Sequence, residues 1–321
     1  MKQIAILVPQ NYRLLSIAAI LDIFQTVNKF SQKAGQAEPF GIKLIYVPGS
    51  GVETAFAAYE LRSTDSDFTA DLVLIPSFDT DDIGGAVKTN GKLIPWITGQ
   101  YNAGAEIASV CSGAFLFAAT GLLNKKSATT HVDACAAFSA AFPEVQLRPD
   151  NTVTEDGRLF TSGGSTSSFH LLLRLVNRYC GKEMAIRVAK VFAIDMDRQS
   201  QSYFSTFQPS RNHNDGLVAT AQEKIEASYH DTGTIEEMIR DIPSSRRNIV
   251  RRFKLVTGIT PIEYLQKTRI EAAKKLLLHT GKQMNDIIFN SGYNDPKAFR
   301  KIFRKSVGMT PTEYREKFQL R

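Results

Sequence analysis

The sequence has few cysteines and none that are paired. Its 321 residues include only Cys111, Cys135 and Cys180, at unrelated spacings and without a Cys-x-x-Cys pair. Disulfide scaffolds need an even set of cysteines, and zinc ribbons need closely paired ones. The sequence therefore predicts neither a disulfide framework nor a zinc ribbon, and its cysteine content fits the reducing cytoplasm. We also expect no metal site and no cofactor.

Long apolar runs are also missing. The run at 4–8 ends at Pro9, and the next one, 14–21, ends at Asp22. Both are shorter than the roughly 20 apolar residues that a bilayer crossing needs, and the first is too short for a signal-peptide core. We expect no membrane segment and a cytoplasmic protein.

Basic residues exceed acidic ones in one part of the chain only. Residues 211–321 carry 21 Lys and Arg against 13 Asp and Glu, a balance of +8, whereas residues 1–210 have a balance of −1. With 43% hydrophobic and 22% charged residues, the composition is that of an ordinary globular protein, and the length suggests two domains. The localised positive charge points to an anionic partner for the last third of the chain.

Short apolar runs alternate with helix-length segments in the first two thirds. The runs lie at 4–8, 42–47, 72–75 and 107–110. Strands of nearly continuous Val, Ile and Leu are typical of a parallel sheet covered by helices on both faces. The pattern predicts an open α/β domain whose ligand binds beyond the carboxyl ends of the strands.

A sharp turn from strand to helix is predicted at Cys111. It follows the run 107–110, and its neighbours Ser112 and Gly113 are small, as such a turn requires. A thiol presented there, at a helix N-terminus, would be exposed and would have a lowered pKa. His131 is then a candidate partner in a Cys–His dyad. The alternative is that the cysteine is an ordinary buried one and that the histidine is structural.

Four motifs follow one another in this region: Val110–Phe115, Ala119–Leu123, Ala128–His131 and Thr161–Gly164. Their order resembles the ThiJ/PfpI-like domain of the class I glutamine amidotransferase fold, in the version found in GlxA-type regulators. The resemblance covers roughly residues 1–200 and implies a flavodoxin-like parallel sheet.

The chain departs from the enzymatic members of that family. The acid that supports the cysteine there falls on Ser16, and the loop 76–78 replaces a glycine-rich oxyanion loop. Acyl transfer would therefore lack its orienting acid and its oxyanion donors. The resemblance implies instead a catalytically degenerate, ligand-binding pocket, with Gly163 and Gly164 offering backbone N–H groups to an anion at the start of the helix from Ser167. The ligand-binding candidates are Ser77, Cys111, Ser112, Gly113, His131, Gly163 and Gly164.

A repeat marks the last third of the chain. The stretch 253–264 returns fifty residues later as 303–314, with Phe, Gly, Thr, Pro, Glu and Tyr at matching places. In each copy a glycine closes one helix, and Thr-Pro opens the next as N-cap and first helical residue. The repeat predicts two helix-turn-helix units, bridged by a long helix from Pro261 to about Leu278.

The helix before each of these glycines has an apolar face and a cationic face. Lys and Arg are usually just solvated, but two such helices in a repeated helix-turn-helix frame favour DNA binding. Residues 218–321 resemble the AraC/XylS DNA-binding domain, most specifically from Gly292 through Arg315. The predicted DNA-binding residues are Arg246, Arg247, Asn248, Val250 and Arg251 in the first unit, and Lys297, Ala298, Arg300 and Lys301 in the second.

These observations predict three segments: a ligand-sensing and dimerisation domain at 1–200, a linker at 201–217 and an all-α DNA-binding domain at 218–321. We expect a transcription regulator that binds double-stranded DNA and a small metabolite, and that is not an enzyme. The resemblance implies a homodimer, contact with RNA polymerase and activation of transcription.

Two alternatives remain open at this stage. A cysteine-dependent hydrolase or amidase fused to a DNA-binding domain predicts turnover that Cys111→Ser abolishes. A structural nucleoid-binding protein predicts no preferred DNA sequence. Neither the effector nor the operator can be read from these residues.

Overall fold

The computed structural model describes residues 1–51, 55–196, 201, 204, 207, 209, 211 and 213–319. The chain divides into two compact units, residues 1–201 and 202–321. Each unit has hydrophobic clusters of its own. The predicted linker spans 201–217. In the structure Gln201 belongs to the first unit, and a helix already begins at Gly216.

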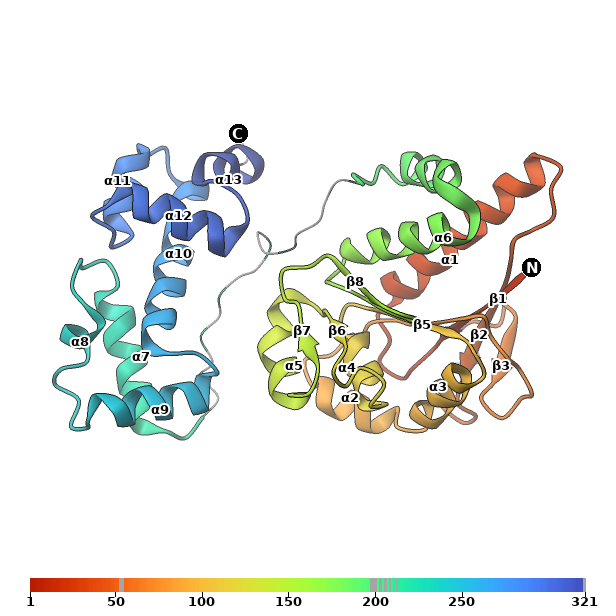
Figure 1. Ribbon diagram of the computed structural model, residues 1–321, viewed down its shortest axis with the longest axis horizontal. Helices are drawn as coiled ribbons and strands as arrows, with labels where there is room; N and C mark the ends of the chain where they lie inside the picture. The colour runs from red at the N-terminus through yellow and green to blue at the C-terminus, as the bar shows by residue number, and fades with distance from the viewer. Residues whose placement is uncertain are drawn as a thin grey trace. The chain divides into compact units, whose positions relative to one another are not determined.

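A mostly parallel sheet forms the centre of the first unit (Figure 1). Its strand order is β3-β2-β1-β4-β5-β9-β8, and every neighbouring pair is parallel except β8 and β9. The predicted α/β fold class is confirmed, with an antiparallel edge strand that the sequence did not indicate. The strands are β1 (Lys2–Leu7), β2 (Phe40–Tyr46), β3 (Leu61–Ser63), β4 (Leu72–Ile75), β5 (Glu106–Val110), β8 (Val153–Asp156) and β9 (Leu159–Ser162).

Helices cover both faces of this sheet. Figure 1 shows α1 and α6 on one face and α2, α3, α4 and α5 on the other, and two separate hydrophobic clusters fill the two interfaces. A short pair of strands, β6 (Ser127–Ala128) and β7 (Gln146–Leu147), and a 3-10 turn, η1 (Val132–Ala134), lie outside the main sheet. The helices are α1 (Leu14–Lys33), α2 (Ile83–Thr89), α3 (Leu93–Asn102), α4 (Gly113–Ala119), α5 (Cys135–Ala141) and α6 (Ser167–Val191).

The first helix is longer than its apolar beginning suggested. The run that seemed to end at Asp22 continues as α1 to Lys33, because Asp22 lies on the exposed face of the helix and interrupts nothing. By length and composition α1 could cross a membrane, and among the described helices it alone meets that test. Ten of its residues are buried, as in a core helix.

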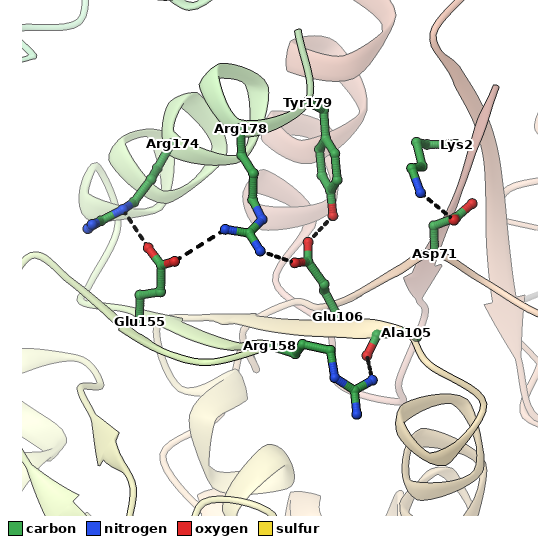
Figure 2. A network of polar contacts seen from close by, with 9 residues as sticks. All are labelled: Lys2, Asp71, Ala105, Glu106, Glu155, Arg158, Arg174, Arg178 and Tyr179. Atoms are coloured by element: carbon green, nitrogen blue, oxygen red, sulfur yellow. Dashed lines mark hydrogen bonds and ion pairs between the residues drawn. The ribbon is translucent and has the colours of Figure 1, made fainter. Parts of the chain in front are cut away.

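Polar contacts fix α6 to the opposite edge of the sheet from the predicted ligand site (Figure 2). Glu106 at the start of β5 pairs with Arg178 at 2.6 Å and accepts a hydrogen bond from the Tyr179 hydroxyl. Burial, together with this carboxylate, raises the pKa of Tyr179, so the phenol stays protonated as a donor. Arg174 and Arg178 both reach Glu155 on β8. These contacts hold α6 against β5 and β8.

The second unit is helical, as predicted. Its first half comprises α7 (Gly216–Ser228), α8 (Ile235–Met238) and α9 (Arg246–Thr257), and its second half comprises α11 (Met284–Asn290), α12 (Pro296–Val307) and α13 (Pro311–Phe318). The long α10 (Pro261–His279) joins the halves, and its boundaries agree with the predicted bridge to within one residue.

Each half of the second unit has its own core. The first cluster includes Phe253 of α9 and Tyr264 of α10, whose rings lie 5.2 Å apart, and the second includes Phe303 of α12 and Tyr314 of α13, 5.8 Å apart. The amino-terminal end of α10 packs into the first cluster and the rest of it into the second. The unit therefore consists of two small helical modules that share one helix.

Candidate functional site

The predicted strand-to-helix turn is present at Cys111. This residue has a φ of 54°, which is unusual for a side-chain-bearing residue, and it joins β5 to α4. Gly113 passes so close to the end of β4 that a Cβ there would lie 2.5 Å from the Pro76 carbonyl oxygen and 2.7 Å from that of Ile75. The turn is thus held by close backbone packing at the carboxyl ends of two adjacent strands.

Replacing Gly113 by alanine should destabilise the first unit by about 1–3 kcal/mol, because backbone atoms must move to admit the methyl group. The matched control is Gly99→Ala in α3, where nothing lies within 4 Å of the added Cβ. That change should leave stability unchanged or raise it by up to about 1 kcal/mol, because alanine favours helix. Urea unfolding followed by the fluorescence of the single tryptophan, Trp96, measures both. Equal stability of the two variants would contradict the close approach at Gly113.

The Cys111 thiol is not the exposed, acidic group that the sequence suggested. Cys111 is only 9% exposed, and this burial raises the pKa of its thiol above the usual range. Backbone N–H groups of Ser165 and Ser112 favour the thiolate but do not offset the burial. The expectation of a lowered pKa was wrong because desolvation outweighs the helix N-terminus here.

We expect Cys111 to be alkylated slowly near neutral pH. Peptide mass spectrometry after iodoacetamide treatment should show at least about tenfold slower modification of Cys111 in the folded chain than in the unfolded chain. Because the folded pKa is raised, the protonated thiol favours folding at neutral pH, and this contribution is lost as the pH rises through the raised value. Modification faster than in the unfolded chain would show an activated thiolate instead.

The donors that would form an oxyanion hole are already used. After β4, the backbone N–H of Ser77 donates to Ser16 Oγ at 3.1 Å, and that of Phe78 donates to Ser112 Oγ at 2.9 Å. Ser16 Oγ itself donates to the Arg13 carbonyl oxygen at 2.8 Å. The site therefore has a hydroxyl where an acid would stand, and the N–H groups of Ser77 and Phe78 are bonded to other partners.

His131 lies at the same edge of the sheet, and its ring makes local contacts. It precedes η1, and its Nδ1 accepts a hydrogen bond from the backbone N–H of Asp133 at 3.2 Å. Its ring covers Gly164, where a Cβ would lie 2.2 Å from the ring. Within the described residues, no hydrogen bond joins His131 to Cys111. The candidate dyad is therefore not assembled in this structure.

The two glycines after β9 do not offer free donors. Gly163 donates its N–H to the Thr152 carbonyl oxygen at 2.9 Å, and Gly164 donates to Oε1 of Gln201 at 3.2 Å. The predicted anion site at these groups is therefore occupied by internal partners. The sequence did not reveal the contact between Gly164 and Gln201, because Gln201 was assigned to the linker.

The structure still brings the predicted ligand residues to one edge. Ser77, Cys111 and Gly163 follow β4, β5 and β9, which are neighbours in the sheet, and Thr130 Oγ1 donates to the Cys111 carbonyl oxygen at 3.1 Å. The described residues contain no group of three or more His, Cys, Asp or Glu that could hold a metal ion.

A separate cavity of about 140 Å³ lies beyond β1 and β2. It is smaller than the roughly 300 Å³ at which small-molecule pockets usually begin. None of the predicted ligand residues is among those that line it, which are Val8, Gln10, Val47, Pro48, Gly49, Ser50, Thr89, Asn90 and Lys92.

The first cationic helix, α9, is anchored by its apolar face. Ile249 and Phe253 are buried, and the Ser245 hydroxyl caps the helix by accepting the Asn248 N–H. On the exposed face Arg251 donates to Asn248 Oδ1 at 3.1 Å. Arg246 pairs with Glu236 of α8 at 2.5 Å, whereas Arg247 is exposed without an ion pair to any described residue.

The second cationic helix, α12, is more strongly divided into two faces. Phe299, Phe303 and Val307 are buried. Five cations lie on the exposed face, and none of them forms an ion pair with another described residue: Lys297, Arg300, Lys301, Arg304 and Lys305. This helix therefore offers unneutralised positive charge, whereas part of the charge on α9 is paired.

The repeated caps are formed as predicted. Gly258 and Gly308 end α9 and α12 in the left-handed conformation, with φ of 77° and 84°. Thr260 and Thr310 cap α10 and α13, each in a reciprocal capping box with a glutamate three residues later. A contact that sequence analysis missed links α7 to α9, where Asp215 pairs with Arg252 at 2.7 Å.

Comparison with known proteins matches both units. The family described as "DJ-1/PfpI family" matches residues 61–178, and the one described as "Helix-turn-helix domain" matches residues 240–317. The chain joins a DJ-1/PfpI domain to an AraC-type helix-turn-helix domain. The resemblance to GlxA-type regulators that the motifs predicted is thereby confirmed.

Relatives that extend over much of the chain are transcriptional regulators. It is 23% identical to the HTH-type transcriptional regulator GbdR of Pseudomonas aeruginosa over 98% of this chain and 84% of GbdR. It is 26% identical to the HTH-type transcriptional regulator GlxA of Rhizobium meliloti over 67% of this chain and 66% of GlxA. An AraC family transcriptional regulator of Pseudomonas putida is similar in fold, with a TM-score of 0.50 at 17% identity, covering 60% of this chain and all of that one. The chain is a transcription regulator of this type.

Proposed function

We propose that this regulator binds paired half-sites on double-stranded DNA through α9 and α12, and that a small metabolite bound beside Cys111 controls this binding. The observation that carries the proposal is the pair of cationic helices, each supported by a separate apolar core and closed by the same caps. Such helices fit the major groove, and two of them on one shared helix can reach neighbouring segments of a duplex.

The exposed side chains of the two helices suggest different contributions. In α9 the Arg251–Asn248 pair places a guanidinium and an amide on the exposed face, the types of group that read guanine and adenine edges. In α12 the free cations suit phosphate contacts, which fix position without reading sequence. The proposed contacts are Arg246, Arg247, Asn248, Val250 and Arg251 in α9, and Lys297, Ala298, Arg300 and Lys301 in α12.

The proposed ligand site is the edge where β4, β5 and β9 end. The buried, neutral thiol of Cys111 and the internally used N–H groups of Ser77 and Phe78 favour binding over catalysis. Resemblance to GlxA-type regulators supports a cytoplasmic homodimer that contacts RNA polymerase and activates transcription. Binding of the metabolite would then change the placement of the two DNA-binding domains in the dimer.

Selection of bound fragments from sheared genomic DNA tests this function. The purified full chain should enrich a small set of fragments with a common sequence at physiological salt, and the set or its enrichment should change when metabolites are added. Retention of all fragments alike would indicate a nucleoid-binding protein. Substrate turnover that is lost in Cys111→Ser would indicate a tethered enzyme.

A further inference from the structure

A buried glutamine occupies a polar cradle at the edge of the proposed ligand site. Gln201 is 1% exposed, and each end of its carboxamide is bonded. The two hydrogens of its Nε2 face three acceptors: Thr129 Oγ1 at 3.2 Å, the Thr130 carbonyl oxygen at 3.0 Å and the Pro149 carbonyl oxygen at 2.9 Å. Its Oε1 accepts the Gly164 N–H at 3.2 Å.

The cradle is shaped for a carboxamide. Thr129 and Thr130 are fully buried, and a Cβ on Gly163 would lie 1.9 Å from Gln201 Oε1, so only glycine leaves room there. The cradle has acceptor oxygens on one side and the Gly164 N–H on the other. These groups match the NH₂ group and the carbonyl oxygen of a carboxamide. A carboxylate would turn an oxygen toward the acceptor oxygens and would lose those hydrogen bonds.

The cradle adjoins the proposed ligand site. Gly164 supports the ring of His131, and Thr130, whose carbonyl oxygen accepts from Gln201, donates its hydroxyl to the Cys111 carbonyl oxygen. Gln201 is therefore bound among the residues that were predicted to hold a ligand. It is also the last residue of the first unit, and the chain continues from it toward α7 of the DNA-binding unit.

We propose that Gln201 is an internal occupant of the effector cradle, and that the effector carries a primary carboxamide that takes its place. This inference rests on the proposed function, because it names the ligand class for the same site. A tethered side chain competes with a free ligand at an effective concentration in the millimolar range. Effector binding then requires release of Gln201, the last residue of the first unit, and this gives the sensor a route to its output.

Hydrogen exchange of the Gly164 amide in the full chain tests this proposal. The variant Gln201→Ala empties the cradle, and Gln146→Ala, an exposed glutamine in the same unit, is the control. The probe is N-acetyl-L-glutamine methylamide, with the glutamate analogue as its matched carboxylate. A second variant, Gly163→Ala, places a methyl group where the carboxamide lies.

In Gln201→Ala the Gly164 amide should exchange at least about tenfold faster than in the wild type, and the carboxamide probe should restore its protection. The carboxamide probe should bind half of the Gln201→Ala molecules at a concentration at least about tenfold lower than it needs for the wild type, because in the wild type the tethered side chain competes with it. Gly163→Ala should exchange rapidly and should not be rescued, and Gln146→Ala should behave as the wild type.

Three results would overturn the proposal: unchanged Gly164 exchange in Gln201→Ala, equal probe affinity of that variant and the wild type, or equal protection by the carboxylate analogue. No DNA is present in these measurements. Failure of the chain to bind DNA would therefore leave them unaffected, so the two proposals can fail separately.

Discussion

Replacing both Arg300 and Lys301 by alanine should weaken binding of the full chain to duplex DNA by about 2–6 kcal/mol, roughly 30-fold to 10⁴-fold. Both side chains are exposed on α12, and neither is neutralised by an ion pair with another described residue. The loss should be similar for all sequences if the pair binds phosphates, and the salt dependence of the binding constant should fall by about one unit per lost contact. Fluorescence anisotropy at several salt concentrations measures both quantities.

The matched control removes the same charge elsewhere in the unit. Lys275 of α10 and Lys282, which precedes α11, are also exposed. The double variant Lys275→Ala/Lys282→Ala should retain most of the affinity if α12 lies in the groove. An equal loss in both double variants would mean that only the net charge of the unit matters.

Phe299→Ala should destabilise the second helical module by about 3–5 kcal/mol while leaving the first module folded. Phe299 is fully buried, and its ring lies 5.1 Å from Tyr293 and 5.6 Å from Phe303, all within one hydrophobic cluster. Hydrogen exchange should show rapid opening of α11–α13 with little change in α7–α9. Phe253→Ala, in the other cluster, should give the reverse pattern.

Phe289→Ala is the control for this pair, because the Phe289 side chain is more than half exposed. Its effect on stability should stay within about 0.5 kcal/mol. If Phe299→Ala opened both modules together, the two clusters would be one cooperative core, and the description of the unit as two modules on a shared helix would be wrong.

The DNA-binding unit could be predicted closely because its signals are local. A glycine that needs a positive φ, such as Gly258, and a Thr-Pro pair that caps the next helix act within a few residues of one another. Their recurrence fifty residues later fixed two units and the bridging helix. The Asp215–Arg252 pair could not be foreseen, because these residues are far apart in the sequence and each is unremarkable by itself.

The sheet was predicted only where its strands are continuously apolar. The run 72–75 coincides with β4, whereas the antiparallel strand β8, with the mixed sequence of Val153–Asp156, gave no such signal. The apolar run 14–21 stops at Asp22, whereas the helix α1 continues to Lys33, because a charged residue on an exposed face does not end a helix.

The predicted ligand residues Ser77, Cys111 and Gly163 do follow neighbouring strands, but the expected state of the Cys111 thiol was wrong. The sequence places Cys111 at a helix N-terminus, yet it does not show how deeply the loops bury the thiol, and burial decides the direction of the pKa shift. Gln201 lies about seventy residues after the threonines that it contacts. A polar segment between domains predicts a linker, and only tertiary packing shows that one of its side chains returns to the cradle.

The most direct measurement of the central claim is a titration of the purified full chain with duplex DNA over a range of salt concentrations. We expect tight binding to fragments enriched from genomic DNA, weaker binding to other duplexes, and a logarithm of the binding constant that falls linearly with the logarithm of the salt concentration. If the protein bound no duplex of any sequence even in dilute buffer, the cationic helices would not be DNA-binding elements and the proposed function would be wrong.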